Sequence, residues 1–574
     1  MNDNFELSTQ HLKAKLFFVV SMFFSSAVLF YFYNHYWYPP DDGAYAHVAD
    51  RILAGDVLNL DVHDVHMGYI NFLHAGALSL FGNDMASLRI PLVILGVIQS
   101  AIIFALLKPK GLGVALIAVA TITSLSFVQY LNPTANWYAL FLTLLLIGCF
   151  DWIPETYKYK IVLIGYILVT LFLFRQLSAV FVSLGAVTFI LYKNHEVVKF
   201  WDHLISKLIF AIMMLGLSGY LYLKISISAT LLFGLWPLVI LIYGLMTVTV
   251  SNNKTLKIMG GLSLGGALAA VPIFIYHIYH GSLLSWYNDT VVSALVLSDL
   301  SFIKIIHFAD YLYYSLGSVL QMSSLVIVMN GFYWMMLILA SSVLGFLLFS
   351  KVLFKNKNLI GLSSLPMIGV FYGLASVHYQ IPIYLYYTVG LSLCGILWMM
   401  DLSPVRKRSI IMLIAGLICF NAISFHAAQP SDRSMVQILQ GEAPKSDEKF
   451  LGGHVQLWVN AREAEQYEHI NELVQKNVKP EETIFAFPTN SEIYYITRRT
   501  NPFRFFNSAF GMSNSKQFDY VLSTFETIPP RMVFFKPDDK YVTDNALKIV
   551  EYINIHYTLL ETVEGIECYI LNSD

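Results

Sequence analysis

Apolar segments recur along most of this chain and are separated by short polar turns. An α-helix needs about 20 mostly apolar residues to cross the hydrocarbon core of a bilayer. The pattern predicts about 13 helices of that kind, and hence an α-helical polytopic membrane protein. They are expected near residues 15–37, 87–107, 112–131, 136–153, 161–174, 176–192, 206–223, 226–250, 258–280, 325–350, 358–376, 383–400 and 408–426.

The composition supports this class. Hydrophobic residues make up 56% of the chain and charged residues 13%, whereas about 25% of the residues in a soluble domain are charged. The formal net charge of -2 gives no basic surface field for nucleic acid. The four cysteines show neither a disulfide framework nor the spacing of a zinc site. No small-residue cleavage site follows the first apolar run, so we expect a retained span rather than a signal peptide.

Basic residues gather in alternate turns between the predicted spans. These turns and the segment before the first span hold Lys13, Lys15, Lys108, Lys110, Lys158, Lys160, Lys193, Lys199, Lys207, Lys254, Lys257, Lys351, Lys355, Lys357, Arg406, Lys407 and Arg408. Turns rich in lysine and arginine stay on the cytoplasmic side of a membrane. We therefore expect an odd number of spans and a cytoplasmic N-terminus. The loop at 38–86, the loop at 281–324 and the C-terminal tail then lie on the outer face.

The tail differs in kind from the rest of the chain. From Gln429 onward the share of charged residues rises, and helical and strand patterns alternate. Helices are expected at 462–477, 517–525 and 543–555, and strands at 483–487, 531–536, 557–562 and 567–571. The domain organisation predicted is a transmembrane domain at 1–426 and a soluble, extracytoplasmic α/β domain at 427–574.

The loop at 38–86 is too polar to span the membrane, and it begins with the acidic pair Asp41 and Asp42. Either carboxylate can cap a helix at 43–53. The apolar residues of that helix form one stripe, so we expect it to lie in the plane of the interface. A second helix is expected at 69–81.

Several motifs follow one another in an order that resembles the start of the GT-C glycosyltransferases. These are polytopic enzymes related to protein mannosyltransferases and to the aminoarabinose transferase of lipid A. The residues that carry the likeness are Asp41-Asp42, Tyr45, Gly55-Asp56, Asp61, Leu80-Phe81-Gly82 and Leu88-Arg89. The match extends to Arg175-Gln176 and to 487–502 in the tail, so it covers the whole chain thinly.

This resemblance implies an inverting transferase that moves a sugar from a polyprenyl-phosphate donor to a lipid, glycan or protein acceptor. Asp41 or Asp42 is the expected general base, because the acceptor hydroxyl needs a carboxylate within hydrogen-bond reach. Tyr45 is expected on the acceptor side. The short chain and the tail are similar to those of bacterial members, which implies a bacterial inner membrane with a periplasmic tail. The alternative for the acidic pair is a helix cap at the membrane interface.

Arg175, His66 and His378 are the candidate ligands of the donor phosphate. Arg175 closes a predicted span, where a guanidinium either extends to lipid headgroups or binds phosphate bidentately. The sequence departs from the family near His66, because relatives often carry a Lys-Pro-Pro step where this chain has His66-Met67-Gly68. A histidine in that place would bind phosphate in a pH-dependent way.

Asp61, His63 and Asp64 form an acidic and histidine-rich segment that ends at His66. Oxygen and imidazole ligands suit Mn²⁺, Mg²⁺ or Zn²⁺, so a divalent metal is a possible cofactor. The alternative is a solvated loop.

Two other classes of function share the polytopic pattern. A lipid-linked sugar flippase or a coupled transporter is the first alternative, but transporters bury ionisable residues near the membrane midplane and these spans hold almost none. A glycan polymerase or ligase is the second. The outer loop at 281–324 has few basic residues for such an enzyme.

Overall fold

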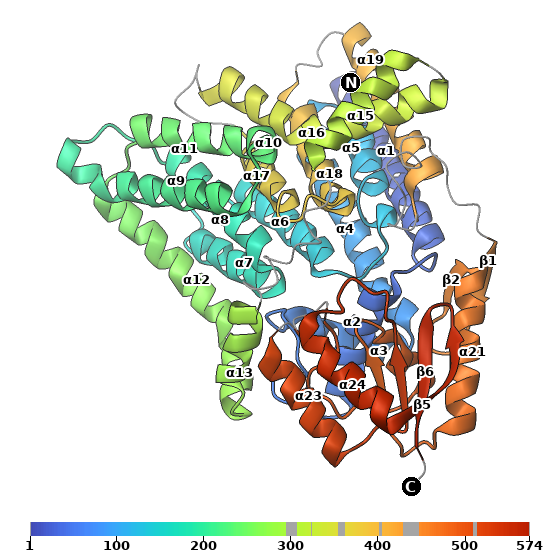
Figure 1. The fold of residues 1–574 in the computed structure, drawn as a ribbon. Coiled ribbons are helices and arrows are strands. Elements are labelled where there is room, and N and C mark those ends of the chain that lie inside the picture. The colour runs from blue at the N-terminus through green and yellow to red at the C-terminus, as the bar shows by residue number, and fades with distance from the viewer. Residues whose placement is uncertain are drawn as a thin grey trace.

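The computed structural model describes residues 2–293, 307–322, 324–353, 362–400, 405–428, 447–508, 512 and 514–572. Figure 1 shows a helical bundle with a smaller α/β part packed beneath it, coloured orange to red. The prediction of a helical membrane protein with a C-terminal α/β part is confirmed.

Eleven helices within the described ranges are long and apolar enough to cross a membrane. They cover Gln10–Phe32, Met85–Lys110, Leu112–Gln129, Ala135–Trp152, Gln176–Lys193, Trp201–Lys224, Ile227–Thr247, Asn252–Tyr279, Leu325–Lys351, Pro382–Met399 and Arg406–His426. Two shorter apolar helices, Lys160–Phe174 and Leu365–Ser376, occupy the places of the two remaining predicted spans. The start of the span predicted at 358–376 lies outside the described residues.

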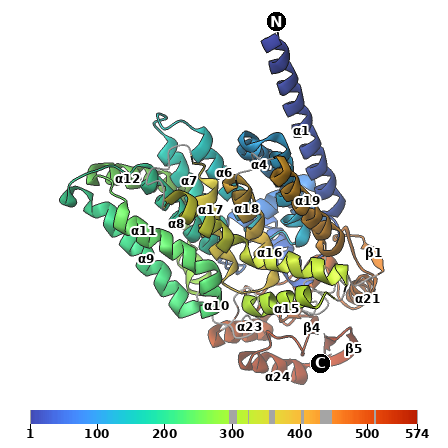
Figure 2. The same cartoon turned by 90° about the horizontal axis from the view of Figure 1, so that it is seen from above.

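Successive helices carry the chain back and forth between the two ends of the bundle. The first six helices of the bundle are α1 (Asn2–Phe32), α4 (Ile90–Leu107), α5 (Leu112–Ser124), α6 (Ala135–Trp152), α7 (Lys160–Phe174) and α8 (Gln176–Lys193). They are followed by α9 (Leu204–Lys224), α11 (Leu235–Thr247), α12 (Asn252–Tyr279), α15 (Phe308–Gln321), α16 (Leu325–Leu348), α17 (Leu365–Tyr372), α18 (Pro382–Met399) and α19 (Val405–Asn421). In Figure 2 the N-terminal part of α1 projects beyond its neighbours.

Small residues let some helices of the bundle approach closely. A Cβ placed on Gly265 of α12 would collide with the backbone of Val162 in α7, and one on Gly165 would collide with that of Leu262. Glycine at such crossings allows backbone contact between helices, which is a common means of association in membranes.

The loop at 38–86 folds into two helices, α2 (Pro39–Leu53) and α3 (Tyr69–Phe81), followed by the 3₁₀ helix η1 (Met85–Arg89). The helix predicted at 69–81 is confirmed, but the capping role predicted for the acidic pair is wrong. The helix α2 begins at Pro39, because proline is well suited to the first helical position, and this places Asp41 and Asp42 inside the first turn.

The prediction that this helix lies in the plane of the membrane interface stays a prediction, and the structure adds that protein covers the helix. All residues of α2 from Asp42 to Ala49 are buried. The reason is visible in Figure 1, where α2 lies between the bundle and the C-terminal part.

The C-terminal part contains a four-stranded sheet in the order β3-β4-β6-β5. Its strands are β3 (Ile484–Phe487), β4 (Met532–Phe535), β5 (Tyr557–Val563) and β6 (Ile566–Leu571), with β3 and β4 parallel and the other pairs antiparallel. The helices α21 (Ala461–Asn477), α22 (Glu492–Thr497), α23 (Ser515–Thr527) and α24 (Leu547–His556) accompany it. All four predicted strands and all three predicted helices are present. The sequence did not reveal α22 or the hairpin of β1 (Glu448–Leu451) and β2 (Leu457–Asn460).

The C-terminal part is held against α2 by close backbone contact and by polar bonds. A Cβ on Gly43 would collide with the backbone of Glu492, so α2 and α22 touch without an intervening side chain. Ser491 donates a hydrogen bond of 3.4 Å to the carbonyl of Pro40, and Arg498 forms an ion pair of 3.0 Å with Asp50. These contacts fix the tail domain beside the acidic pair.

Candidate active site

The two carboxylates of the acidic pair have different environments. Asp42 is fully buried, and its Oδ1 accepts a hydrogen bond of 3.0 Å from Arg89, which is also fully buried. Its Oδ2 accepts a bond of 3.0 Å from the backbone N–H of Tyr38. Arg89 also donates to the carbonyls of Tyr33 and His35. Asp42 therefore joins α2 to the end of α1 and the start of α4.

Asp41 is only half-buried, and its Oδ2 accepts a hydrogen bond of 2.8 Å from the amide of Asn132. Burial, with the Asp42 carboxylate as a second cause, raises the pKa of Asp41 to about 7, although Asn132 and Lys540 act in the opposite direction. A carboxyl with a pKa near neutrality can exchange a proton at ordinary pH, as a general base must. Asp41 has this property together with access, whereas Asp42 is sealed inside the protein.

Arg175 lies between α7 and α8, where the backbone is extended at φ -148 and ψ 102 and the helix is interrupted. Its half-buried guanidinium interacts electrostatically with the hydroxyls of Tyr45, Tyr379, Tyr384 and Tyr387. Within the described part of the chain, no carboxylate forms an ion pair with Arg175. Its charge is thus available to an anion.

Three tyrosines connect Arg175 to the acidic pair. Tyr384 and Tyr387 of α18 and Tyr45 of α2 each interact electrostatically with both Asp41 and Arg175. The rings of Tyr384 and Tyr387 have centroids 5.4 Å apart. We call Asp41, Tyr45, Arg175, Tyr384 and Tyr387 the Asp41–Arg175 cluster. It contains a carboxylate, a guanidinium and phenol hydroxyls, and the hydroxyls can donate or accept hydrogen bonds.

His66 and Tyr45 lie together beside this cluster. The ring centroids of His66 and Tyr45 are 5.6 Å apart, and Tyr45 donates a hydrogen bond of 3.4 Å to Thr134. His66 Nδ1 is 2.6 Å from Oδ1 of Asp64. Burial opposes the ionisation of Asp64, but His66 and its hydrogen bonds, with that from Asn71, lower the pKa of Asp64 below its ordinary value. Asp64 therefore balances any positive charge on His66.

His378 lies in the turn before α18, and its Nδ1 is 3.1 Å from the hydroxyl of Tyr220 in α9. Its ring is 4.3 Å from that of Tyr379, which interacts with Arg175. His378 thus borders the cluster through Tyr379.

The structure does not bring Asp61, His63 and Asp64 together around one point. Asp61 accepts a bond of 2.8 Å from the N–H of Val57, and His63 Nε2 lies 3.6 Å from Asp289. Asp64 faces His66, as described above. Among residues with described positions, no three His, Cys, Asp or Glu side chains form a group that could hold a metal ion. The buried side chain of His63 contacts Asp289 instead of the solvated surroundings of an exposed loop.

The C-terminal part adds residues to this region that the sequence did not suggest. Lys540 and Tyr541 both interact electrostatically with Asp41, and Tyr541 also interacts with Tyr379. The segment that carries them is held by a hydrogen bond of 2.7 Å from Thr489 to Asp539. Asn132, Tyr384 and Tyr387 were missed as well. Only their polar character inside apolar surroundings could have indicated them.

No protein-family model and no curated protein matches this sequence. The chain is similar to several solved structures. One is ArnT from Cupriavidus metallidurans bound to undecaprenyl phosphate, with 11% identity, a TM-score of 0.39, and coverage of 96% of this chain and 97% of that chain. Its apo state has 10% identity, a TM-score of 0.37 and 98% coverage of both chains.

A third similar structure is the archaeal oligosaccharyltransferase AglB from Archaeoglobus fulgidus, in complex with an inhibitory peptide and a dolichol-phosphate. Its identity is 10%, its TM-score is 0.43, and 91% of this chain and 69% of that chain are covered. Because these TM-scores are low, the function is inferred from the side chains of this chain alone.

Proposed function

We propose that the protein is a membrane glycosyltransferase that moves a sugar from a polyprenyl-phosphate donor to an acceptor on the outer face. The observation that carries this proposal is that Asp41 and Arg175 both interact electrostatically with the same three tyrosines, Tyr45, Tyr384 and Tyr387. A transfer from a phosphate-linked sugar needs one group that accepts a proton and one that holds the leaving phosphate. Asp41 and Arg175 supply the two groups.

In the proposed reaction Asp41 takes the proton of an acceptor hydroxyl. The hydroxyl oxygen attacks the anomeric carbon of the donor sugar from the face opposite the phosphate, and a new C–O bond forms. The bond between the anomeric carbon and the phosphate oxygen breaks, and the phosphate departs with the electron pair. The configuration at the anomeric carbon is inverted. Asn132 orients Asp41 and stabilises its ionised form through the 2.8 Å hydrogen bond.

Arg175 is the principal ligand proposed for the leaving phosphate. A guanidinium matches two phosphate oxygens at once, and this one has no carboxylate partner among the described residues. His66 is a weaker candidate, since its Nδ1 already contacts the Asp64 carboxylate at 2.6 Å. His378 is proposed to act from the edge of the site through Tyr379. Lys540, which is exposed and interacts with Asp41, is a further cation near the site.

The orientation proposed follows from the basic turns together with the position of the cluster. The helix α2, which carries Asp41, lies at the end of the bundle next to the C-terminal part (Figure 1), and Asn132 bonds to Asp41 there. The lysine-rich turns are at the other end of the helices they connect, as between α4 and α5. The cluster and the tail domain are then on the outer, periplasmic face of a bacterial inner membrane, and the lipid donor approaches from the bilayer.

The proposal is tested with the protein reconstituted in lipid vesicles that contain polyprenyl-phosphate sugars. We expect release of polyprenyl phosphate by the wild type, and a loss of at least about 100-fold in the Asp41→Asn variant. Asp519→Asn, a change to an exposed carboxylate on α23, is the matched control. Equal rates for wild type and Asp41→Asn would exclude Asp41 as the base.

A further inference from the structure

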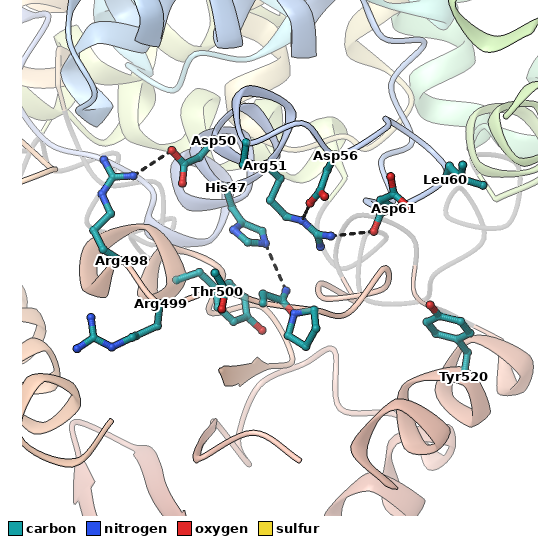
Figure 3. A pocket seen from close by; sticks show the side chains of 14 residues that line it. His47, Asp50, Arg51, Asp56, Leu60, Asp61, Arg498, Arg499, Thr500 and Tyr520 are labelled. Carbon is teal, nitrogen blue, oxygen red and sulfur yellow. Dashed lines mark hydrogen bonds and ion pairs between the residues drawn. The ribbon is translucent and has the colours of Figure 1, made fainter. Parts of the chain in front are cut away.

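A second site lies on the other side of α2 from Asp41. It is a cavity of about 520 Å³ between the C-terminal half of α2, the loop after it and the tail domain. Figure 3 shows its lining, which includes His47, Asp50 and Arg51 from α2, with Arg498 and Tyr520 from the tail. This volume falls in the range of about 300–1,000 Å³ typical of sites for small molecules.

This cavity and the Asp41–Arg175 cluster lie on different faces of one helix. Asp41 and Tyr45 are one turn apart, and so are His47 and Arg51. Because successive residues turn by about 100°, the two pairs point roughly 120° away from each other. The cavity is therefore separate from the proposed reaction site, although both are built on α2.

Charges of both signs line the cavity. Arg51 and Arg498 contribute guanidinium groups, and Asp50, Asp56 and Asp61 contribute carboxylates. Arg499 also lines the cavity, but its buried guanidinium donates to Val478, Thr497 and Gln475 instead. Arg51 pairs with Asp56 at 2.5 Å and Arg498 with Asp50 at 3.0 Å, as the dashed lines in Figure 3 show. Burial lowers the pKa of His47 well below its ordinary value, so this ring adds no charge. The two ion pairs neutralise each other and the Asp61 carboxylate is left over, so the lining has no net positive charge to attract an anion.

Each of the three aspartates nevertheless has a carboxylate oxygen that can accept a further hydrogen bond. Asp50 uses Oδ1 for Arg498, Asp56 uses Oδ2 for Arg51, and Asp61 uses Oδ2 for a backbone N–H. Within the described residues, the second oxygen of each has no hydrogen-bond partner. Three free carboxylate oxygens around one cavity repel an anion and accept hydrogen bonds from hydroxyl groups.

One end of the cavity is apolar and open. Leu60 is 41% exposed and Tyr520 is 44% exposed, and both line the cavity. An exposed phenol ring offers a flat face on which an apolar ligand face can pack. A pyranose fits both features of the cavity. The hydroxyls around its rim can donate hydrogen bonds to the carboxylates, and its flat face of C–H groups can pack on the apolar end.

We propose that this cavity binds a neutral saccharide. Given the transferase function proposed above, on which this role rests, the saccharide is part of the acceptor, held at a distance from the hydroxyl that reacts. Such a second contact raises the local concentration of the acceptor near Asp41 without taking part in the chemistry.

Direct binding tests this without any measurement of transfer. The full-length protein in nanodiscs is mixed with maltotriose, chitotriose or mannotriose, and saturation-transfer NMR records which of them binds. We expect binding of at least one trisaccharide, and binding about tenfold weaker in Tyr520→Ala, in which the stacking face is lost. Leu560→Ala, on a residue that is also 44% exposed but on β5, is the control and should bind as the wild type does.

Other outcomes overturn the proposal. The absence of any trisaccharide signal from the wild type would do so, as would displacement of the saccharide by inorganic phosphate, or equal binding by Tyr520→Ala. The Asp41→Asn variant separates the two proposals, because it should bind the trisaccharide normally. An inactive Asp41→Asn with no saccharide bound to the wild type would leave the transferase standing and remove the second site.

Discussion

The carboxylate of Asp42 and the guanidinium of Arg89 form an ion pair of 3.0 Å in which neither side chain is exposed to solvent. Arg89 also donates to the carbonyls of Tyr33 and His35, which directly follow α1. The ion pair therefore connects α2 to α1 and α4. The two neighbouring aspartates therefore differ in role. Asp42 has a structural partner in Arg89, whereas the carboxylate of Asp41 remains accessible.

Asp42→Asn should lower the thermal stability of the protein more than it lowers the rate of transfer. The substitution leaves the Arg89 charge buried without a counter-charge, which typically costs about 3–5 kcal/mol. We expect a large fall in the melting temperature of the detergent-solubilised protein, measured by fluorescence-detected size exclusion after heating. Asp41→Asn, at the neighbouring carboxylate that is only half-buried, is the matched comparison. A melting temperature that is lower for Asp41→Asn than for Asp42→Asn would reverse the two roles.

The rate of transfer should depend on pH through Asp41. The base must be ionised, and its pKa is raised to about 7, so activity should rise as the pH increases through 7 and level off above it. Asn132 donates a hydrogen bond to the carboxylate and thereby favours the ionised form. In Asn132→Ala the midpoint of the pH–rate profile should therefore move to higher pH. A profile that is flat from pH 5 to 9, a range of about two units on each side of 7, would contradict this.

Substitution of Arg175 should affect the donor more than the acceptor. Arg175→Gln removes a cation that has no carboxylate partner among the described residues, and we expect KM for the polyprenyl-phosphate donor to rise at least about tenfold. Arg175→Lys keeps the charge but cannot bind phosphate bidentately, so its donor KM should lie between those of the wild type and Arg175→Gln. Donor titrations at fixed acceptor concentration measure both. An unchanged donor KM in Arg175→Gln would place the phosphate elsewhere.

Close contact between α2 and the tail domain requires a glycine at position 43, because a side chain there would collide with Glu492. Gly43→Ala would push α2 away from α22, because the backbones of Gly43 and Glu492 are in direct contact and leave no space for a methyl group. We expect easier proteolytic release of the tail and a loss of activity, with the bundle still folded. Gly55→Ala, at a glycine of the same loop with open space around it, controls for the loss of a glycine, although its positive φ of +105 adds backbone strain of its own. Equal protease resistance in wild type and Gly43→Ala would argue against this contact.

Much of the fold was predictable because its signals are local. Each predicted span corresponds to an apolar helix, and the strands of the tail follow from alternating or continuous apolar runs such as Ile484–Phe487. The start of α2 was missed because two prolines extended the helix backwards over the acidic pair. The hairpin of β1 and β2 was missed, since strands of four residues carry little periodic signal.

The candidate site was predictable only in part, because its contacts join distant positions. Asp41, Tyr45 and Arg175 were named from motifs, and the structure brings them together. The choice between Asp41 and Asp42 depends on Arg89, which is 47 residues from Asp42, and on Asn132, which is 91 residues from Asp41. Lys540 reaches the site only because the tail folds back under α2. No spacing along the chain encodes such a contact.

The most direct test of the central claim is mass spectrometry of the lipids that co-purify with wild-type protein and with Asp41→Asn. The account predicts a polyprenyl phosphate with the wild type, and its sugar-bearing form retained with the variant, which binds the donor but cannot activate an acceptor. The mass of the retained lipid would identify the sugar. Both samples free of polyprenyl species, under conditions that keep ordinary phospholipids bound, would contradict the proposed function.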